Sequence, residues 1–228
     1  MGGALVGYAQ RDGVHAEIAA TDLAVIEQLV AELTARGVTT VWSHGSHSPL
    51  ETALARAGFT AGRTLHQLRR GLAAAKVPIP EARDGVTIRT FVAGQDEAAL
   101  LKVNAAAFAS HPEQGGWTSA DLAARAAEDW FDPGGIFLAQ RGSDVLAFHW
   151  TKIHPDGNGE VYVIGVDPAA QGLGLGALLL AYGLRHLADH GCRTVLLYVD
   201  HENTGARALY ARTGFTEYDR DVQWVRAE

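Results

Sequence analysis

Apolar and polar positions repeat with strand-like and helix-like periods along the chain after residue 85. Alternation and short apolar runs between turn residues predict strands, and apolar positions three or four residues apart predict helices. The predicted strands cover 85–91, 135–140, 145–153, 159–166, 194–199 and 216–225. The predicted helices cover 94–109, 119–131 with Ser119 as N-cap, the stretch after a glycine-rich loop to about 190, and 203–214. This order predicts an α/β or α+β fold with a mixed sheet that binds ligands at strand ends.

The region before residue 85 repeats part of this pattern. Residues 36–60 resemble residues 190–216 when a two-residue gap is allowed, and "ALVGYAQRDG" echoes "VLAFHWTKIHPDG". Residues 71–85 contain two prolines and several small residues, and they interrupt the periodicity on both sides. The sequence therefore predicts tandem α/β units, with a degenerate, truncated unit at 1–71, a linker at 72–85 and a second unit at 86–228.

Composition narrows the class of protein. An apolar share of 47% and a charged share of 20% are typical of a globular protein, and no apolar run approaches the about 20 residues of a membrane helix. A net charge of −7 argues against nucleic acid as a partner and suits a cationic amine. The single cysteine, Cys192, starts an apolar run, so we expect it to be buried. With no signal peptide visible, it favours a reducing cytoplasm. The choice between monomer and homodimer stays open.

A glycine-rich loop with Gly172, Gly174 and Gly176 joins a predicted strand to a predicted helix. Such a loop aims backbone N–H groups and the positive end of a helix dipole at an anion, and glycine lets a phosphate approach the backbone. The spacing is not a dinucleotide-binding fingerprint, and no Gly-Lys-Ser/Thr follows as in a Walker loop. On this segment alone, an anion site and a tight turn between buried elements are equally supported.

Two spaced motifs favour the anion site. Residues 164–176 with Gln171, Gly174 and Gly176 resemble the acetyl-CoA motif of the Gcn5-related N-acetyltransferases (the GNAT family), and Asn203 to Phe215 resemble that family's later signature "N-x-x-A-x-x-L-Y-x-x-x-G-F". The strings "HPEQGGWT", "EDWFDPGG", "FHWTKIHPDG" and "GEVYVIGVDPAAQGLGLG" resemble the mycothiol synthases within it, tandem enzymes that acetylate the cysteinyl amine of a glucosaminyl-inositol pseudo-disaccharide. The resemblance implies acetyl-CoA as co-substrate, held by Ile164, Gly165, Val166, Gln171, Gly172, Leu173, Gly174, Leu175, Gly176, Ala177, Asn203, Ala206 and Arg207.

The same resemblance makes Glu160 the general base and Tyr210 the acid that protonates the leaving thiolate. Strict alternation places Glu160 on one face with Tyr162, Ile164 and Val166. We expect the backbone N–H groups of Ile164–Val166 to polarise the thioester oxygen. Without the motifs, Glu160 would be interpreted as a solvent-facing carboxylate of a polar turn and Tyr210 as a core aromatic. Asn203, which begins the later signature, is also a good helix N-cap.

For the acceptor amine, the resemblance implies contacts from Glu113, Lys152, Glu160 and Tyr198. The residues themselves leave a milder alternative, in which Lys152 is a solvated lysine at a strand end and the nearby tryptophans Trp117 and Trp150 only pack. The chain has ten histidines, but those of "HGSH" at 44–47 lack a further close ligand cluster, so no metal is predicted.

The first unit lacks the parts that carry the chemistry. Counting back from the "GF" pair, Leu54 falls where Tyr210 falls in the second unit, and "HAEIAATDLAVIEQLV" passes from strand to helix without a glycine-rich loop. We therefore expect the first unit neither to bind CoA there nor to catalyse. We also expect it to start late, without an acidic acceptor contact that a typical first unit supplies.

The sequence thus predicts an acetyl-CoA-dependent N-acetyltransferase of a small amine, with the mycothiol precursor as the favoured acceptor. Alternatives are acetylation of another amino sugar, peptide or drug-like amine, a CoA-binding regulatory module without turnover, and an interaction protein that uses its first half as a docking surface. Retention of both Glu160 and Tyr210 argues against the regulatory module.

Overall fold

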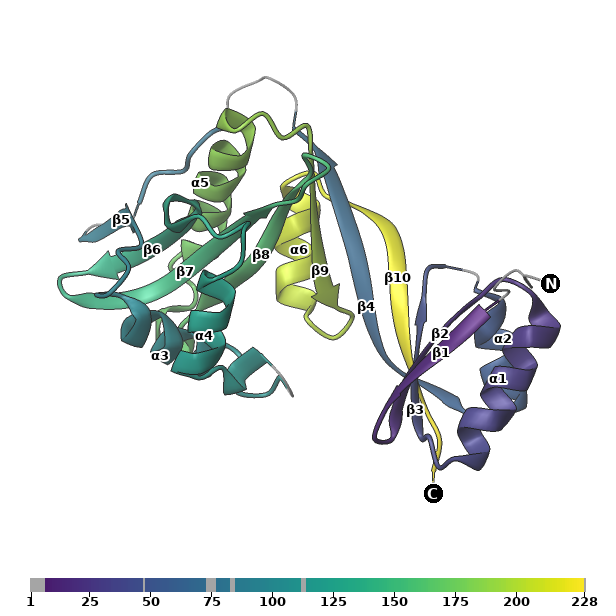
Figure 1. The fold of residues 1–228 in the computed structure, drawn as a ribbon. Coiled ribbons are helices and arrows are strands. Elements are labelled where there is room, and N and C mark those ends of the chain that lie inside the picture. The colour runs from purple at the N-terminus through teal and green to yellow at the C-terminus, as the bar shows by residue number, and fades with distance from the viewer. Residues whose placement is uncertain (1–6, 47, 73–76, 83–84, 112–113, 228) are drawn as a thin grey trace. The chain divides into compact units, whose positions relative to one another are not determined.

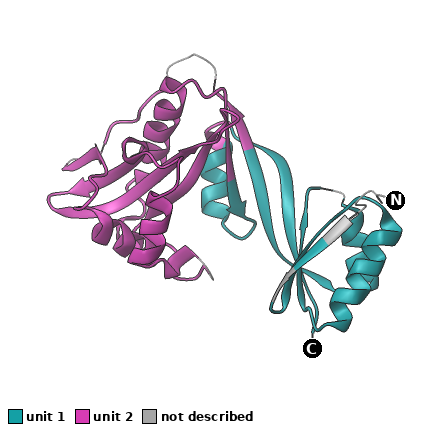
Figure 2. Ribbon diagram, viewed as in Figure 1, with its two compact units in different colours: residues 1–68, 198–211, 215–228 teal, residues 69–197, 212–214 magenta. Residues whose placement is uncertain are grey.

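The computed structural model describes residues 7–46, 48–72, 77–82, 85–111 and 114–227. The chain divides into two compact units, coloured separately in Figure 2. Unit 1 comprises residues 1–68, 198–211 and 215–228, and unit 2 comprises residues 69–197 and 212–214. This division follows proximity in space, and the domain boundaries expected from the sequence stay a prediction.

Unit 1 is a mixed sheet with helices α1 and α2 packed against it (Figure 1). Its strand order is β1-β2-β3-β10-β4, in which β2 and β3 run parallel while β1–β2 and β3–β10 run antiparallel. Ile26, Val30 and Leu33 of α1 recur at helical spacing and form one core with residues of β2, β3 and α2. The elements wholly or mostly in this unit are β1 (Gly7–Asp12), β2 (His15–Ala20), α1 (Leu23–Ala35), β3 (Thr40–His44), α2 (Pro49–Arg56), β4 (Thr60–Gly71), α6 (Thr204–Arg212) and β10 (Thr216–Val225).

Unit 2 is a mixed sheet with helices on both faces (Figure 1). Its strand order is β9-β8-β7-β6-β5, antiparallel except for the parallel pair β8–β9. One apolar cluster lies under α3 and α4 around Trp150, and another lies under α5 around Leu179. Its elements are β5 (Val86–Thr90), α3 (Glu97–Ala107), η1 (Gln114–Gly116), α4 (Ser119–Ala126), η2 (Pro133–Gly135), β6 (Ile136–Arg141), β7 (Asp144–Ile153), β8 (Gly159–Val166), η3 (Pro168–Ala170), α5 (Leu175–Asp189) and β9 (Thr194–Asp200).

The strands and helices predicted after residue 85 are all present. Their bounds differ from the prediction by at most three residues except at α4, which differs in two ways. Its N-cap is Thr118 rather than Ser119, because Thr118 and Asp121 form a reciprocal capping box in which Thr118 Oγ1 accepts from Asp121 N–H at 3.2 Å. The helix also ends at Ala126, five residues earlier than predicted, and tighter turns follow it. In the part of the chain that the structure describes, no helix is long and apolar enough to cross a membrane.

The sequence repeat has a counterpart in local geometry. Gly58 after α2 and Gly214 after α6 have φ of +85° and +87°, which an L side chain rarely adopts. The next residue closes the helix end in the same way in both places: Phe59 N–H donates to the Leu54 carbonyl at 3.0 Å, and Phe215 N–H donates to the Tyr210 carbonyl at 3.0 Å. Leu54 and Tyr210 therefore occupy equivalent positions, as the count from "GF" predicts.

Candidate active site

The glycine-rich loop ends at the N-terminus of α5, which has no side chain to cap it. Gly174 is the N-cap residue with φ +75°, and the first turn holds no acidic residue. The first full helical bond runs from Leu178 N–H to the Gly174 carbonyl at 3.1 Å, so the N–H groups of Leu175, Gly176 and Ala177 have no carbonyl four residues back within the helix. These N–H groups and the helix dipole suit an anion.

Space at the loop is open as well. A Cβ added at Gly172, with φ +79°, or at Gly174 would meet no heavy atom within 4 Å, so neither glycine is required there by packing. The positive φ of both glycines is what a turn requires, and the open space beside them leaves room for an anion at the uncapped end of α5.

The corresponding helix of unit 1 is closed to an anion. Helix α1 follows β2 after only two residues, Thr21 and Asp22. Asp22 is its N-cap, and the Asp22 carboxylate accepts from Val25 N–H at 3.1 Å. A carboxylate in this position satisfies the helix end and repels a phosphate. Unit 1 thus has neither the glycine loop nor a free helix N-terminus at this place.

Strand β8, which leads into the glycine loop, contains an irregularity that changes which side chains share a face. Val163 pairs with Trp150 of β7 and Val161 pairs with the next residue, Thr151, so Tyr162 is an extra residue in the ladder. Such a bulge turns the following side chains to the opposite face and is common next to active sites. Strict alternation along β8 is therefore wrong.

The bulge separates the residues that alternation had placed together. Glu160 pairs with Lys152, whose Nζ lies 4.4 Å from the centre of the Trp130 ring, on the face covered by α3 and α4. Ile164 and Val166 belong to the cluster under α5, on the other face. Glu160 and Tyr162 therefore face the α3/α4 side, whereas Ile164 and Val166 pack beneath the helix that carries the loop.

Glu160 is nearly buried, which makes the interpretation as a solvent-facing carboxylate wrong. It retains 9% of its accessible surface and pairs with Leu196 at the last position of the short parallel ladder between β8 and β9. Its Oε2 lies 2.7 Å from His154 Nε2. A buried carboxylate next to an imidazole can take a proton and pass it on, and this is the chemistry that a general base needs.

His154 was not singled out by the sequence patterns, although strand pairing could have indicated it. The β7–β8 hairpin pairs Ile153 with Gly159, and His154 N–H donates to the Asn158 carbonyl at 2.8 Å. His154 is therefore the diagonal neighbour of Glu160, and diagonal neighbours of an antiparallel pair lie within reach of long side chains.

Aromatic and cationic side chains cluster on the face that carries Glu160. The rings of Trp130 and Tyr162 lie 4.9 Å apart, and Lys152 Nζ lies 5.6 Å from the Tyr162 ring centre. Arg125 of α4 stacks its guanidinium 4.0 Å from the Trp117 ring centre and donates to Tyr162 Oη at 3.1 Å. Lys152 is thus held by ring faces rather than freely solvated. Trp117 and Trp150 belong to the core under α3 and α4, as the packing alternative expected.

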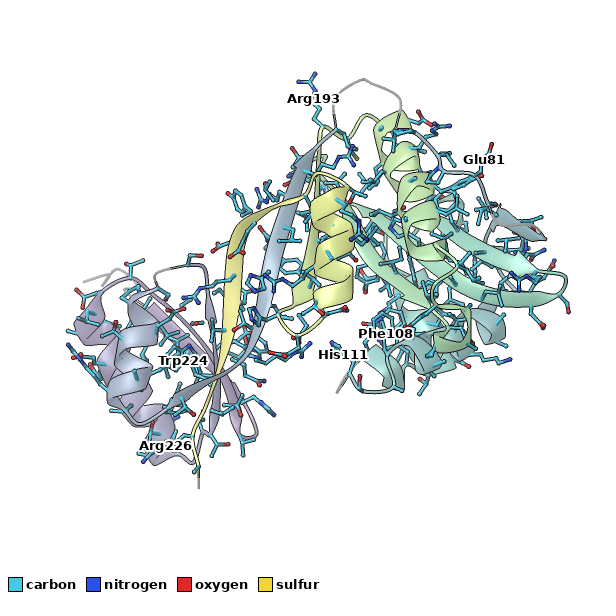
Figure 3. The ribbon with its side chains drawn as sticks, turned by 180° about the vertical axis from the view of Figure 1, so that it is seen from behind. Glu81, Phe108, His111, Arg193, Trp224 and Arg226 are labelled. Atoms are coloured by element: carbon cyan, nitrogen blue, oxygen red, sulfur yellow. The ribbon has the colours of Figure 1, made fainter. Side chains whose placement is uncertain are left out.

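Close packing explains why residue 165 of β8 is a glycine. A Cβ there would lie 2.8 Å from the Phe148 ring and 3.3 Å from the Phe108 ring. Phe108, labelled in Figure 3 beside His111, ends α3 and covers this part of β8. The requirement for glycine therefore comes from the two phenylalanines, and any contact of the Gly165 backbone with a ligand would be additional.

The remaining predicted residues lie in unit 1. Asn203 is confirmed as a cap, since its Oδ1 accepts from Ala206 N–H at 3.1 Å, and Arg207 donates to the His201 carbonyl at 3.3 Å. Tyr198 is 47% exposed, and its hydroxyl accepts from Gln67 Nε2 at 2.6 Å.

Tyr210 is buried at 5% exposure, and its ring lies 5.7 Å from that of Phe215. Burial raises the pKa of the Tyr210 phenol above its ordinary value, so the group keeps its proton at neutral pH. A packing role and a role as proton donor are both compatible with this position.

The structure therefore groups the predicted residues by unit. Glu160, Lys152 and the segment 164–177 belong to unit 2, whereas Tyr198, Asn203, Ala206, Arg207 and Tyr210 belong to unit 1. Glu113 lies outside the described residues. Cys192 is confirmed as a buried packing residue at 4% exposure, and burial raises the pKa of its thiol.

Comparison with known proteins identifies the family. A model described as "Acetyltransferase (GNAT) family" matches residues 103–215. A protein of Thermomonospora curvata named mycothiol acetyltransferase is 54% identical over 190 residues, which cover 83% of this chain and 64% of that protein. A protein of the same name from Geodermatophilus obscurus is 46% identical over 250 residues, which cover 99% of this chain and 80% of that protein. The match to the Thermomonospora protein thus spans slightly less than two thirds of its length.

Solved structures agree on the fold. A GCN5-related N-acetyltransferase from Sphaerobacter thermophilus gives a TM-score of 0.79 at 24% identity, covering 96% of this chain and 76% of that one. A tandem GNAT protein from the clavulanic acid biosynthesis pathway gives 0.67 at 16% identity, covering 96% and 78%. The fold is the mixed α/β architecture that the sequence predicts, and the chain belongs to the GNAT family of acetyltransferases, which use acetyl-CoA as co-substrate.

Proposed function

We propose that this chain transfers the acetyl group of acetyl-CoA to the cysteinyl amine of the glucosaminyl-inositol precursor of mycothiol. The names of its relatives and the strings shared with mycothiol synthases support this acceptor. The observation that carries the proposal is the buried carboxylate of Glu160, bonded to His154 on the strand that leads into the glycine loop.

Acetyl-CoA fits the unit 2 loop. The pyrophosphate accepts hydrogen bonds from N–H groups of Gly172 to Ala177, where the helix end is uncapped and the glycines leave open space. Beyond Glu160, the edge of β8 that faces β9 has no ladder partner among the described residues, and amides of an extended ligand can pair with such an edge. We assign the contacts with the pyrophosphate to Gln171 and the glycine loop. We assign the pairing with the amides of acetyl-CoA to the backbone of Ile164–Val166.

The chemistry divides between a base and an acid. Glu160 removes a proton from the acceptor ammonium, and the free amine nitrogen attacks the thioester carbonyl carbon while the carbon–sulfur bond breaks. Tyr210, whose phenol keeps its proton at neutral pH, gives that proton to the departing sulfur. The nitrogen loses its second proton to solvent as the amide forms, and the Tyr210 phenolate takes up a proton from solvent to restore the phenol. Lys152, Tyr198 and Glu113 contact the acceptor, by the family resemblance. A cytoplasmic location remains a prediction from the single cysteine.

The test uses Glu160→Gln, assayed with acetyl-CoA and the cysteinyl pseudo-disaccharide. Product must be measured by mass, because the acceptor carries its own thiol and would react with reagents that detect free CoA. We expect kcat to fall by about 10²- to 10⁴-fold, the usual contribution of a general base, with little change in acetyl-CoA affinity. A panel of amines without the cysteinyl group, including glucosaminyl-inositol and an amino sugar, tests the acceptor.

A matched control exists in unit 1. Glu17 pairs with Trp42 in the parallel β2–β3 ladder, just as Glu160 pairs with Leu196 in the parallel β8–β9 ladder of unit 2. Unlike Glu160, Glu17 is exposed. Glu17→Gln should therefore leave kcat unchanged. Normal turnover by Glu160→Gln would contradict the role of Glu160 as general base. Faster turnover of another amine by the unchanged chain would contradict the proposed acceptor but not the role of Glu160.

A further inference from the structure

A second cluster of ionisable groups lies in unit 2 at the opposite end of α5 from the glycine loop. His186 and His190 are four residues apart at the C-terminal end of the helix, and Asp132 precedes η2. One ligand atom from each residue lies within 4.8 Å of the others. His186 Nε2 and Asp132 Oδ2 are 3.3 Å apart, and the imidazole rings of the two histidines are 4.1 Å apart.

Hydrogen bonds to the backbone orient His190 and Asp132 in this cluster. His190 Nδ1 donates to the His186 carbonyl at 2.8 Å, which leaves His190 Nε2 as the nitrogen with the lone pair. Asp132 Oδ1 accepts from Gly134 N–H at 2.8 Å, which leaves Oδ2 for His186. Metal-binding histidines and carboxylates are oriented by just such outer bonds, and two histidines four residues apart on a helix are a common zinc-binding pair.

The surroundings favour a cation beside the cluster. The C-terminal end of a helix carries partial negative charge, which attracts a cation. Gly135 lies against the cluster: a Cβ there would lie 2.6 Å from Thr151 Oγ1, 3.1 Å from His186 Nε2 and 3.5 Å from Asp132 Oδ2.

We propose that Asp132, His186 and His190 form a binding site for one Zn²⁺ ion, with water as the fourth ligand. Two ligands at about 2.1 Å from a tetrahedral zinc ion are about 3.4 Å apart, close to the 3.3 Å between His186 Nε2 and Asp132 Oδ2. His190 is exposed, and it offers a ligand atom within 4.8 Å of those of the other two residues.

The site is structural rather than catalytic. His186 lies 11 residues after Leu175, the first residue of α5, which corresponds to about 16 Å along a helix. The ion therefore does not reach the proposed acetyl-CoA loop. It joins the turn before β6 to the end of α5 and stabilises unit 2, and this role does not depend on the proposed function.

The test uses untagged full-length protein, freed of metal by chelation and titrated with Co²⁺ as a spectroscopic substitute for Zn²⁺, then with Zn²⁺ in competition. We expect one ion per chain, the intense visible absorption of tetrahedral Co²⁺, and a higher unfolding temperature with metal. His190→Ala and Asp132→Asn should each weaken binding by at least about 10-fold, because even outer-shell changes cost about 10- to 100-fold. Neither should change the unfolding temperature in chelator by more than a few degrees.

His15→Ala removes an exposed histidine of unit 1 and should bind Co²⁺ like the unchanged protein. The absence of a tetrahedral Co²⁺ spectrum would overturn the proposal. So would an unchanged affinity in the well-folded His190→Ala variant. Acetyl transfer by the metal-free protein should equal that of the loaded protein, so failure of the zinc site and failure of the proposed activity give different results.

Discussion

The contrast between the two helix N-termini leads to a specific prediction at Gly174. Helix α1 carries its own anion, the carboxylate of Asp22, at 3.1 Å from Val25 N–H, whereas α5 begins at Gly174 without a side-chain cap. Gly174→Asp places a carboxylate at the equivalent N-cap of α5. It should compete with the pyrophosphate for the same N–H groups, while Gly174→Asn adds a side chain of nearly the same shape without charge.

Comparing these two variants isolates the charge, because both residues pay a similar penalty for the left-handed backbone at φ +75°. One carboxylate charge about 5 Å from one phosphate charge costs about 0.8 kcal/mol at a dielectric constant of 80 and about 3.3 kcal/mol at 20. Gly174→Asp should therefore bind acetyl-CoA about 4-fold to about 250-fold more weakly than Gly174→Asn. The difference should shrink as salt is added.

Calorimetric titration with acetyl-CoA measures both affinities and the number of sites, and the unchanged chain should bind one molecule. Thermal unfolding provides the control: the aspartate favours the helix N-terminus, so Gly174→Asp should be at least as stable as Gly174→Asn. Equal acetyl-CoA affinities in the two variants would refute the placement of the pyrophosphate at α5. Two acetyl-CoA sites on the unchanged chain would contradict the inference that the N-terminus of α1 in unit 1, which Asp22 caps, does not bind acetyl-CoA.

Three further predictions follow from burial and packing. Tyr210→Phe should lower kcat at least about 10-fold with acetyl-CoA affinity nearly unchanged, and full kcat would remove its role as acid. Gly165→Ala should destabilise the protein by about 1–3 kcal/mol in urea unfolding, because its Cβ would lie 2.8 Å from the Phe148 ring. Gly205→Ala in α6, with no atom within 4 Å, should be neutral or stabilising, and equal costs would contradict the packing argument. Burial lowers the pKa of His149 from the ordinary 6.5 to about 4. As the pH drops from about 6.5 to about 4, this histidine is protonated in the unfolded chain but still neutral in the folded one. The free energy of unfolding should therefore fall by up to about 3 kcal/mol over this range. His149→Gln should lose that part of the acid sensitivity, and an unchanged slope in urea titrations across this pH range would reject it.

The sequence patterns predict local structure well because helices, turns and loops depend on neighbouring residues. The glycine loop, the Asn203 cap and the equivalence of Leu54 with Tyr210 all follow from spacing along the chain. Acetyl-CoA motifs can be recognised for the same reason, since the loop and its helix form one continuous segment.

Features set by pairing between strands escaped prediction. The extra residue at Tyr162 reverses which side chains share a face, and only the register against β7 reveals it. The bond from Glu160 to His154 depends on the same hairpin. The approach of Asp132 to His186 brings together residues 54 positions apart, so no local pattern in the chain indicates the cluster.

The proposed acetyl transfer is tested most directly by the product of one reaction. The chain is incubated with acetyl-CoA and the cysteinyl pseudo-disaccharide, and the acetylated product is analysed by mass and by fragmentation. We expect the acetyl group on the cysteinyl nitrogen and a free thiol, and we expect Glu160→Gln to form this product at least about 100-fold more slowly. An acetyl group on sulfur, or no product from this acceptor while another amine is acetylated, would contradict the proposed transfer.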